Sequence, residues 1–272
     1  MFLGSLVMSA APIQVHGHRG ARAVRPENTI PAFEYALDTG VDALEMDVAV
    51  TKDDVLVISH DPELNPEICR GPSGSKVIRE LTFDELRRWD CGSLVNPRFP
   101  RQQTVPGTRI PALEEVLALA PRGNFLFNIE TKIFKDKPQY TPAPERFAEL
   151  LLRAIDRHKL RQRVIVQSFD FRPLVVLKKL APDIRVAALD EDETLGDFVR
   201  VARSAGARII SPEKGMVTPP RVVAAHDAGL EVIPWTANTP AEWDPLIASG
   251  VDAIITDDPA ALIDHLKRKK LR

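Results

Sequence analysis

Two histidines, an arginine and two carboxylates stand close together near the N-terminus, each beside an apolar run that is typical of a strand. They are His18, Arg19, Glu45, Asp47 and His60. Histidine side chains titrate near neutral pH and therefore suit general acid–base chemistry. Paired carboxylates offer hard oxygen ligands for Mg²⁺ or Ca²⁺. Because α/β barrels keep their chemistry at the carboxyl ends of strands, this spacing predicts one site that combines a divalent cation with acid–base histidines.

The two carboxylates are expected on one face of a strand, because Glu45 and Asp47 are two residues apart. The connection that follows, 51–54, is too short for a crossover helix, so the next strand must return antiparallel. The turn then places His60 opposite Met46 and beside the carboxylates. The first histidine comes from the neighbouring strand, so both histidines could face one metal-bound ligand.

A later strand, predicted at 124–131, ends in another charged pair. Glu130 and Lys132 are again two residues apart and share a face. Such a pair is often a simple ion pair. Alternatively, Glu130 completes a set of three carboxylates for one divalent ion, and Lys132 lies as a point charge near a phosphate. Arg19 could be solvated, or it could donate bidentate hydrogen bonds to phosphate oxygens.

Together these motifs resemble the glycerophosphodiester phosphodiesterase family. In chain order they are His18-Arg19-Gly20, Pro26-Glu27-Asn28-Thr29, Glu45-Met46-Asp47, His60-Asp61, Glu130-Thr131-Lys132 and Trp235-Thr236. The resemblance covers 17–259 and implies a phospholipase C-like barrel with one divalent cation, Mg²⁺ or Ca²⁺. It implies catalytic roles for His18 and His60, phosphate or substrate contacts from Arg19, Lys132 and Trp235, and metal ligation by Glu45, Asp47 and Glu130.

The reaction implied by this resemblance is hydrolysis of a small glycerophosphodiester to sn-glycerol 3-phosphate and an alcohol such as choline or ethanolamine. One histidine would deprotonate water or the neighbouring glycerol hydroxyl, and the other would protonate the leaving alkoxide. The alternatives are a lysophospholipase D or sphingomyelinase D-like enzyme that acts on lyso-lipids, a non-catalytic barrel that binds phosphorylated ligands, and a metal-dependent sugar isomerase. Arg19 and Lys132 favour an anionic substrate over a sugar.

The whole chain alternates strands with helices, which predicts a parallel sheet closed into a TIM (β/α)8 barrel. Eight parallel strands are expected at 13–18, 43–49, 124–131, 163–168, 184–189, 207–211, 231–236 and 252–256, with a hairpin strand at 55–60. Helices are expected at 29–39, 82–88, 113–119, 145–158, 172–180, 195–205, 220–228, 240–249 and 259–269. We expect one domain over 1–272, with 61–112 as an insertion or lid.

Several other residues have plainer explanations. Asn28 can cap the helix that follows it, and Thr82 and Glu85 match a capping box. Asp257-Asp258-Pro259 resembles the terminal motif of the family, but we expect Asp257 and Asp258 to cap the last helix. Gln167-Ser168-Phe169 lies at the end of a predicted strand and is expected to line the mouth of the barrel. His158, His226 and His265 fall on or near helices and are expected on the surface.

The composition limits the partners and the compartment. With 36 basic and 38 acidic residues among 272, the net charge of −2 argues against electrostatic binding of nucleic acid. No apolar run is long enough for stable insertion into a membrane. Cys69 and Cys91 are too few for a disulfide framework, so we expect free thiols, although the two could pair. Residues 1–12 lack the positive region of a signal peptide, so we expect a cytoplasmic protein or a true start at Met8, with a periplasmic or secreted protein as the alternative.

Overall fold

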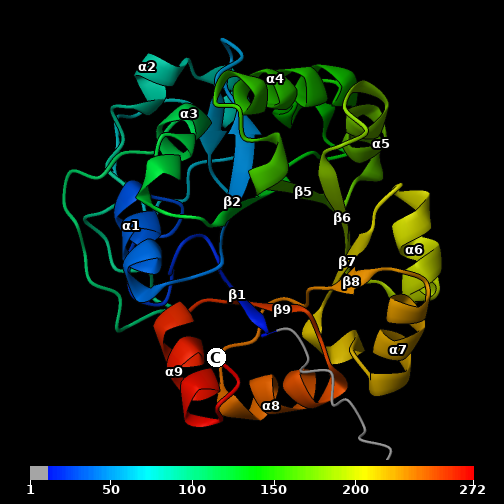
Figure 1. Ribbon diagram of the computed structural model, residues 1–272. Helices are drawn as coiled ribbons and strands as arrows, with labels where there is room; N and C mark the ends of the chain where they lie inside the picture. Colours follow the sequence, from blue (N-terminus) through cyan, green and yellow to red (C-terminus); the bar gives the residue numbers. More distant parts are fainter. Residues whose placement is uncertain (1–11) are drawn as a thin grey trace, which may run out of the picture.

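Parallel strands form a barrel that is surrounded by helices (Figure 1). The computed structural model describes residues 12–272. The predicted TIM barrel is confirmed, with strand ends that differ from the expected ones by a few residues. The parallel strands are β1 (Gln14–Gly17), β2 (Ala43–Val50), β4 (Leu126–Thr131), β5 (Val164–Ser168), β6 (Arg185–Asp190), β7 (Ile209–Pro212), β8 (Glu231–Val232) and β9 (Ala253–Thr256).

The strands follow the order β8-β7-β6-β5-β4-β2-β1-β9. The backbone N–H of Asp252 donates to the carbonyl of Val232 at 3.0 Å, which joins the two ends of the sheet. The hairpin strand β3 (Leu56–Ile58) pairs antiparallel with β2, with Val48 opposite Ile58. Extending this register by two residues places His60 opposite Met46, as predicted.

Helices cover the outside of the barrel, and most lie within a few residues of the predicted ranges. They are α1 (Ile30–Thr39), α2 (Phe83–Leu86), α3 (Leu113–Leu117), α4 (Pro144–Arg157), α5 (Phe171–Leu180), α6 (Phe198–Ser204), α7 (Pro219–Asp227), α8 (Pro240–Ser249) and α9 (Pro259–Arg268). The capping box predicted for Thr82 and Glu85 is confirmed at the start of α2. The interleaving of strands and helices brings the carboxyl ends of all the parallel strands to one face of the barrel.

The start of α1 differs from the prediction. Its N-cap is Thr29, whose hydroxyl accepts a hydrogen bond from the N–H of Ala32 at 3.4 Å. Asn28 instead adopts a left-handed φ of 57° and donates from its side chain to Asp47 at 2.9 Å. The capping role predicted for Asn28 is therefore wrong, because its side-chain amide donates to the buried carboxylate of Asp47 instead.

The apolar core lies in two places. The larger part fills the space between the strands and the surrounding helices and includes Phe33, Phe127 and Phe147. A smaller cluster lies inside the barrel and consists of Ile165, Ala187, Ile209, Ile233, Ala253 and Ile255. Branched apolar side chains are the usual content of such an interior. Leu126 and Trp235 pack against this cluster, and polar side chains at other inward positions form the site described below.

Residues 61–112 leave the barrel after β3 and return to it at α3. They bury apolar side chains of their own, among them Ile78, Leu86 and Trp89. Arg70 and Asp90 exchange backbone hydrogen bonds of 2.7 Å in an antiparallel bridge. Because the two segments run in opposite directions, the adjacent residues Cys69 and Cys91 lie opposite each other. These two cysteines form a disulfide. The expectation of free thiols is wrong, because this bridge is a tertiary contact that the cysteine count does not reveal.

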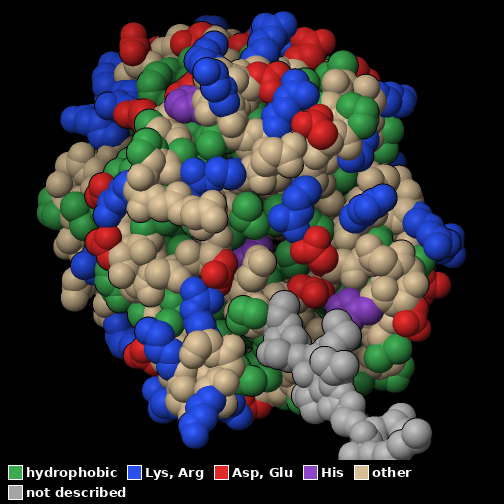
Figure 2. Space-filling model, in the orientation of Figure 1, with side chains coloured by type: hydrophobic (Ala, Val, Ile, Leu, Met, Phe, Trp, Pro, Cys, Tyr) green, Lys and Arg blue, Asp and Glu red, His purple; other side chains and the backbone are tan. Residues whose placement is uncertain are grey.

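The surface shown in Figure 2 carries interspersed basic and acidic side chains, without a large region of one sign. No helix in the range 12–272 has the length and apolar character needed to cross a bilayer.

His226 is exposed as expected, whereas His265 is only 7% exposed and pairs with Asp244 at 2.6 Å. The surface position expected for His265 is wrong, because α9 packs against α8. The alternatives of a signal peptide and of a start at Met8 concern residues outside the described range.

Candidate active site

A cavity of about 490 Å³ opens at the carboxyl ends of the strands. It gathers residues from the loops after β1, β3, β4 and β8, although these loops are far apart in the sequence. The predicted site residues that line it are His18, Arg19, Glu45, His60, Glu130, Lys132 and Trp235. Asp47 lies directly behind this lining. The structure therefore brings all the predicted site residues together.

Three carboxylates form the buried centre of the site. Glu45, Asp47 and Glu130 each offer an oxygen, and these oxygens lie within 4.8 Å of one another. All three side chains are buried. Strand register explains the arrangement, because Asp47 on β2 lies directly opposite Glu130 on β4. The pairing of parallel strands thus adds the third carboxylate to the two on β2.

One oxygen of this centre lacks a hydrogen-bond donor. Oδ1 of Asp47 is buried and accepts no hydrogen bond from residues 12–272, and Nζ of Lys132 lies 3.8 Å away from it. A buried carboxylate oxygen is unfavourable unless a donor or a cation meets it. A set of carboxylate oxygens suits Mg²⁺ or Ca²⁺. Glu45, Asp47 and Glu130 could therefore hold one metal ion.

Crowding perturbs the ionisation of the three carboxylates. Burial raises the pKa of Glu45 well above its ordinary value, and the charges of Asp47 and Glu130 raise it further. Burial also raises the pKa of Glu130, against the opposing effect of Lys132. Burial alone would raise the pKa of Asp47, but Arg19, His60 and Lys132 hold it well below its usual range. A bound divalent ion would favour the ionised form of all three.

The loop after β1 wraps around this centre. Arg19 has a left-handed φ of 49°, which is uncommon for a residue with a side chain. In this conformation its N–H donates to Oε2 of Glu45 at 2.8 Å, and its Nη1 donates to Glu27 at 2.6 Å. Its Nε lies 3.2 Å from Asp47 as an ion pair that lacks good hydrogen-bond alignment. Gly20 follows with φ of 82°, and a Cβ there would approach the backbone of α1 to 2.7 Å, so a glycine is needed.

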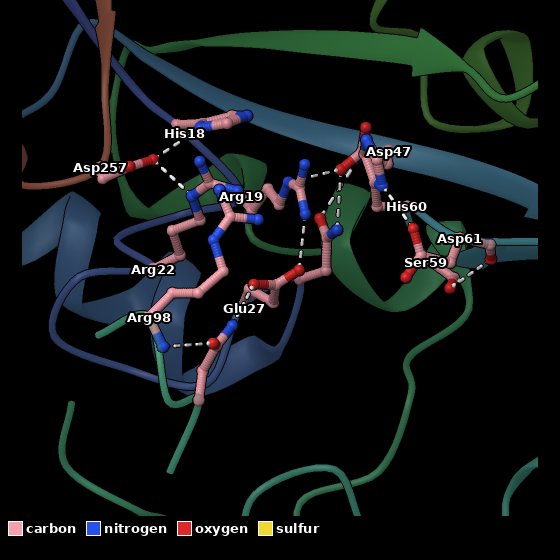
Figure 3. Close-up of polar contacts among 12 residues, drawn as sticks. His18, Arg19, Arg22, Glu27, Asp47, Ser59, His60, Asp61, Arg98 and Asp257 are labelled. Atoms are coloured by element: carbon pink, nitrogen blue, oxygen red, sulfur yellow. Dashed lines mark hydrogen bonds and ion pairs between the residues drawn. The ribbon is translucent and has the colours of Figure 1, made fainter. Parts of the chain in front are cut away.

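His18 is oriented by a residue that the sequence argument placed elsewhere. Its Nδ1 lies 2.6 Å from Oδ1 of Asp257, and its Nε2 faces the cavity, 3.9 Å from Glu45 (Figure 3). Arg22 donates to the same oxygen of Asp257 at 2.6 Å. The pKa of His18 is lowered to about 4, chiefly by burial and then by the charge of Arg22, while the hydrogen bond to Asp257 opposes both.

Asp257 therefore does not cap the last helix, which was its expected role. Asp258 alone caps α9, where its side chain accepts from the N–H of Ala261 at 3.2 Å. Burial would raise the pKa of Asp257, but His18 and Arg22 hold it well below its usual range. The available signal was the match of Asp257-Asp258-Pro259 to a terminal family motif. That signal did not identify the partner, because His18 lies 239 residues away in the sequence.

His60 lies on the other side of the carboxylates and is also bonded to an acid. Its Nδ1 lies 2.7 Å from Oδ1 of Asp61 (Figure 3). Its side chain is 36% exposed, compared with 11% for His18. The hydrogen bond from His60 holds the pKa of Asp61 below its ordinary value. Each histidine thus has one ring nitrogen fixed by a carboxylate and the other nitrogen left for chemistry.

The remaining predicted residues line the walls of the cavity. Lys132 donates to Glu130 at 2.6 Å, so the ion pair considered from the sequence exists within the carboxylate centre itself. Trp235 donates from Nε1 to the carbonyl of Ser211 at 2.9 Å. Phe169 packs edge-to-face against Trp235, with ring centroids 5.5 Å apart. These two rings form an apolar wall.

Comparisons with known proteins identify the family. The family model for the glycerophosphoryl diester phosphodiesterase family matches residues 18–261. The chain belongs to this family. It is 33% identical over 254 residues to a glycerophosphodiester phosphodiesterase of Caldanaerobacter subterraneus subsp. tengcongensis, and the match covers 93% of this chain and 98% of that one. The protein is accordingly an enzyme, a phosphoric diester hydrolase.

Solved structures of the family share the fold. A putative glycerophosphoryl diester phosphodiesterase from Silicibacter pomeroyi is 32% identical and superposes with a TM-score of 0.85, over 92% of this chain and 91% of the other. An Oleispira antarctica phosphodiesterase, solved in complex with the product sn-glycerol-3-phosphate, is 22% identical with a TM-score of 0.80, over 94% and 97% of the two chains. At that lower identity the likeness shows the barrel alone.

Proposed function

We propose that this member of the family hydrolyses glycerophosphodiesters to sn-glycerol 3-phosphate and an alcohol, with one divalent ion and two acid–base histidines. The observation that carries this proposal is the three-carboxylate centre with a carboxylate-bound histidine on each side. The product complex of the Oleispira relative supports the choice of glycerol phosphate as product. A divalent ion held by Glu45, Asp47 and Glu130 would neutralise the phosphodiester charge and polarise its phosphorus.

The two histidines would carry the protons. Asp257 and Asp61 accept from Nδ1 of His18 and His60, so Nε2 of each neutral ring carries a lone pair. One histidine takes the proton from water or from the neighbouring glycerol hydroxyl, and the other, when protonated, gives its proton to the leaving alkoxide. The carboxylate partners hold the rings in place and stabilise the imidazolium while it exists.

The cationic and apolar groups would bind the rest of the substrate. Arg19 and Lys132 supply donors for phosphate oxygens as negative charge builds on them. Trp235, with Phe169 against it, offers a flat surface for the carbon atoms of glycerol. The segment 61–112 would act as an insertion of a single-domain barrel and help to choose the substrate, because its Arg98 reaches the cavity.

One observation favours a second candidate, hydrolysis of lyso-lipids. A hollow of about 440 Å³ adjoins the mouth and shares Ile133, Phe134 and Phe169 with it. Phe169 is 40% exposed there, and Lys135 and Lys137 lie on the rim. Asp136 and Asp170 also line the hollow, so its apolar wall, and not its charge, is the feature that suits an acyl chain. A higher kcat/KM for lysophosphatidylcholine than for glycerophosphocholine would favour this candidate.

The test of the main proposal is release of glycerol 3-phosphate from glycerophosphocholine in Mg²⁺, in Ca²⁺ and in EDTA. Parent protein is compared with His18→Ala and Glu45→Ala, and with His226→Ala as a control, since His226 is exposed and outside the cavity. We expect metal-dependent product from the parent and the control, and none from the two site variants. Lack of product from the parent with either metal would contradict the substrate assignment.

We also infer an oxidising compartment from the paired Cys69 and Cys91. Disulfides persist outside the cytosol and are rare within it, so this pair favours the periplasmic or secreted alternative over the cytoplasmic expectation. Alkylation of free thiols at the moment of cell lysis tests the inference. We expect unmodified cysteines before reduction, and two labelled thiols per chain at lysis would contradict an oxidising location.

A further inference from the structure

A line of buried polar side chains crosses the barrel interior to the carboxylate centre. It runs from His16 on β1 through Asn128 on β4 and Gln167 on β5 to Glu45 on β2, and each is no more than 1% exposed. Nδ2 of Asn128 lies 3.4 Å from Nδ1 of His16 and 3.1 Å from Oε1 of Gln167. Nε2 of Gln167 lies 3.0 Å from Oε1 of Glu45. Buried amides need hydrogen bonds, and here each is bonded to the next, although Oδ1 of Asn128 accepts none from the described residues.

The carboxylate at one end determines the direction of every bond along the line. An ionised Glu45 can only accept, so Gln167 must turn its amide nitrogen toward it. The amide oxygen of Gln167 then faces Asn128, which must present its own nitrogen. Nδ1 of His16 meets that same nitrogen and must accept, which leaves the imidazole proton on Nε2, 3.5 Å from Oε1 of Gln14.

We propose that Gln167 positions the Glu45 carboxylate for the metal ion, and that Asn128 and His16 fix the orientation of the Gln167 amide. This inference rests on the proposed metal-dependent function. Oε2 of Glu45 is held separately by the N–H of Arg19 at 2.8 Å. The two donors together therefore fix the plane of the carboxylate and leave its remaining lone pairs for the ion.

The Asn128 amide matters because the Gln167 amide could otherwise turn over. A flipped Gln167 would place its oxygen against Oε1 of Glu45, and two negative oxygens at that separation repel each other. Asn128 prevents the flip by donating to the oxygen of Gln167. Burial lowers the pKa of His16 to about 4, so the neutral ring that this arrangement needs is present at neutral pH. His16, Asn128 and Gln167 would thus be positioning residues that act through Glu45.

Calorimetric titration of Ca²⁺ and of Mg²⁺ into metal-free protein tests the proposal without an activity assay. We expect Gln167→Leu to weaken metal binding by about 10- to 100-fold, the usual effect of removing a partner of a metal ligand. We expect Asn128→Leu to weaken it several-fold, although Gln167 is intact. Ser211→Ala is the matched control, because Ser211 on β7 is fully buried, donates to the carbonyl of Ile233 at 2.6 Å and does not line the cavity. It should bind metal as the parent does.

The outcomes separate this inference from the proposed function. If the parent binds neither ion, the metal site itself is wrong. If the parent binds and Gln167→Leu binds equally well, the positioning role is overturned while the metal site stands. If only Asn128→Leu matches the parent, the role assigned to Asn128 and His16 is overturned. Cooperative thermal unfolding of each variant in EDTA establishes that it is folded.

A second measurement needs no destabilising change. In the ¹⁵N-histidine NMR spectrum of the parent saturated with Ca²⁺ at pH 7, where the bound ion keeps Glu45 ionised, His16 should be neutral with its proton on Nε2. Its signals are assigned by their absence from His16→Gln. A proton on Nδ1, or a charged ring, would reverse the direction of the line and overturn the proposal.

Discussion

The two halves of the barrel interior are built in opposite ways. Strands β1, β2, β4 and β5 turn a histidine, three carboxylates and two amides inward, together with the apolar Ile165 of β5. Strands β6 to β9 turn in mainly aliphatic side chains: Ala187, Ile209, Ala253 and Ile255. The polar half depends on hydrogen bonds and ion pairs of fixed direction, whereas the apolar half depends on shape and on the exclusion of water.

This contrast predicts that function and stability depend on different halves of the interior. Burial, and then the charges of Asp47 and Glu130, raise the pKa of Glu45, so an ionised Glu45 opposes folding in the absence of a cation, although nearby cations favour the ionised form of Asp47. The apolar half has no such conflict and can offset it. We therefore expect substitutions in the polar half to remove function with little loss of stability, and substitutions in the apolar half to do the reverse.

The largest effect is expected for Glu45→Gln. Loss of one carboxylate should lower kcat/KM at least about a thousandfold, which is about 4 kcal/mol of barrier. In EDTA its free energy of unfolding should equal or exceed that of the parent, because the substitution removes charge repulsion with Asp47 and Glu130. Urea unfolding and diester hydrolysis measure the two quantities. A fall in stability of more than about 2 kcal/mol would show that the carboxylates hold the barrel together.

The opposite result is expected for Ile209→Ala in the apolar half. Ile209 is 1% exposed, and deletion of its buried methyl and methylene groups should lower the free energy of unfolding by about 4 kcal/mol. The affinity of the folded protein for Ca²⁺ should not change. Val223→Ala is the control, because Val223 is 57% exposed and should shift stability by less than about 0.5 kcal/mol. A metal affinity that fell with Ile209→Ala would break the separation between the two halves.

The parts of the site that the sequence could predict are those that depend on short-range regularity. Two carboxylates two residues apart must share a face of a strand, and a four-residue turn fixes the register that brings His60 beside Met46. Glu130 joins them because strand-end residues of a barrel converge on one rim. All three features follow from the two-residue period of strands and from the alternation of strands with helices.

The remaining features depend on contacts that the sequence does not encode locally. Asp257 meets His18 because the last strand of the barrel closes against the first. Asn28 has the type and position of a helix cap, but a buried carboxylate, Asp47, attracts it more strongly. The disulfide arises from the antiparallel bridge beside Cys69, inside a segment with little periodicity. In each case a long-range partner overrides the local pattern.

A smaller effect on stability is expected from pH in the polar half. Burial lowers the pKa of His16 to about 4 from an ordinary value of 6.5, so between these values the unfolded chain binds a proton that the native ring does not. Stability should therefore fall as the pH drops from 6.5 to 4, by about 3 kcal/mol from this residue. Urea unfolding of parent and His16→Gln across this range isolates the contribution. Between pH 6.5 and 4 the parent should lose about 3 kcal/mol more stability than His16→Gln, and parallel profiles would mean that folding does not lower the pKa of His16.

The smallest effect is expected from a substitution of Arg98, which belongs to the segment 61–112 and adds a positive charge at the mouth of the cavity. Arg98 lines the cavity and makes no ion pair with the residues that the structure describes (Figure 3). Its N–H donates to Asn96, which donates in turn to Glu27 beside the His-Arg-Gly loop. This unpaired cation should attract an anionic substrate without taking part in the chemistry. We expect Arg98→Gln to raise KM about tenfold, which is about 1.4 kcal/mol, with kcat nearly unchanged.

Arg101 provides the matched control for this last prediction. It lies three residues further along the same segment and is 78% exposed, but it pairs with Asp258 and does not line the cavity. Arg101→Gln should therefore leave KM unchanged. Raising the salt concentration should increase KM for the parent more than for Arg98→Gln, because screening weakens the attraction that the variant has already lost. Equal KM values for parent and Arg98→Gln would mean that the segment 61–112 does not attract the substrate. Only the barrel strands and their short loops would then bind it.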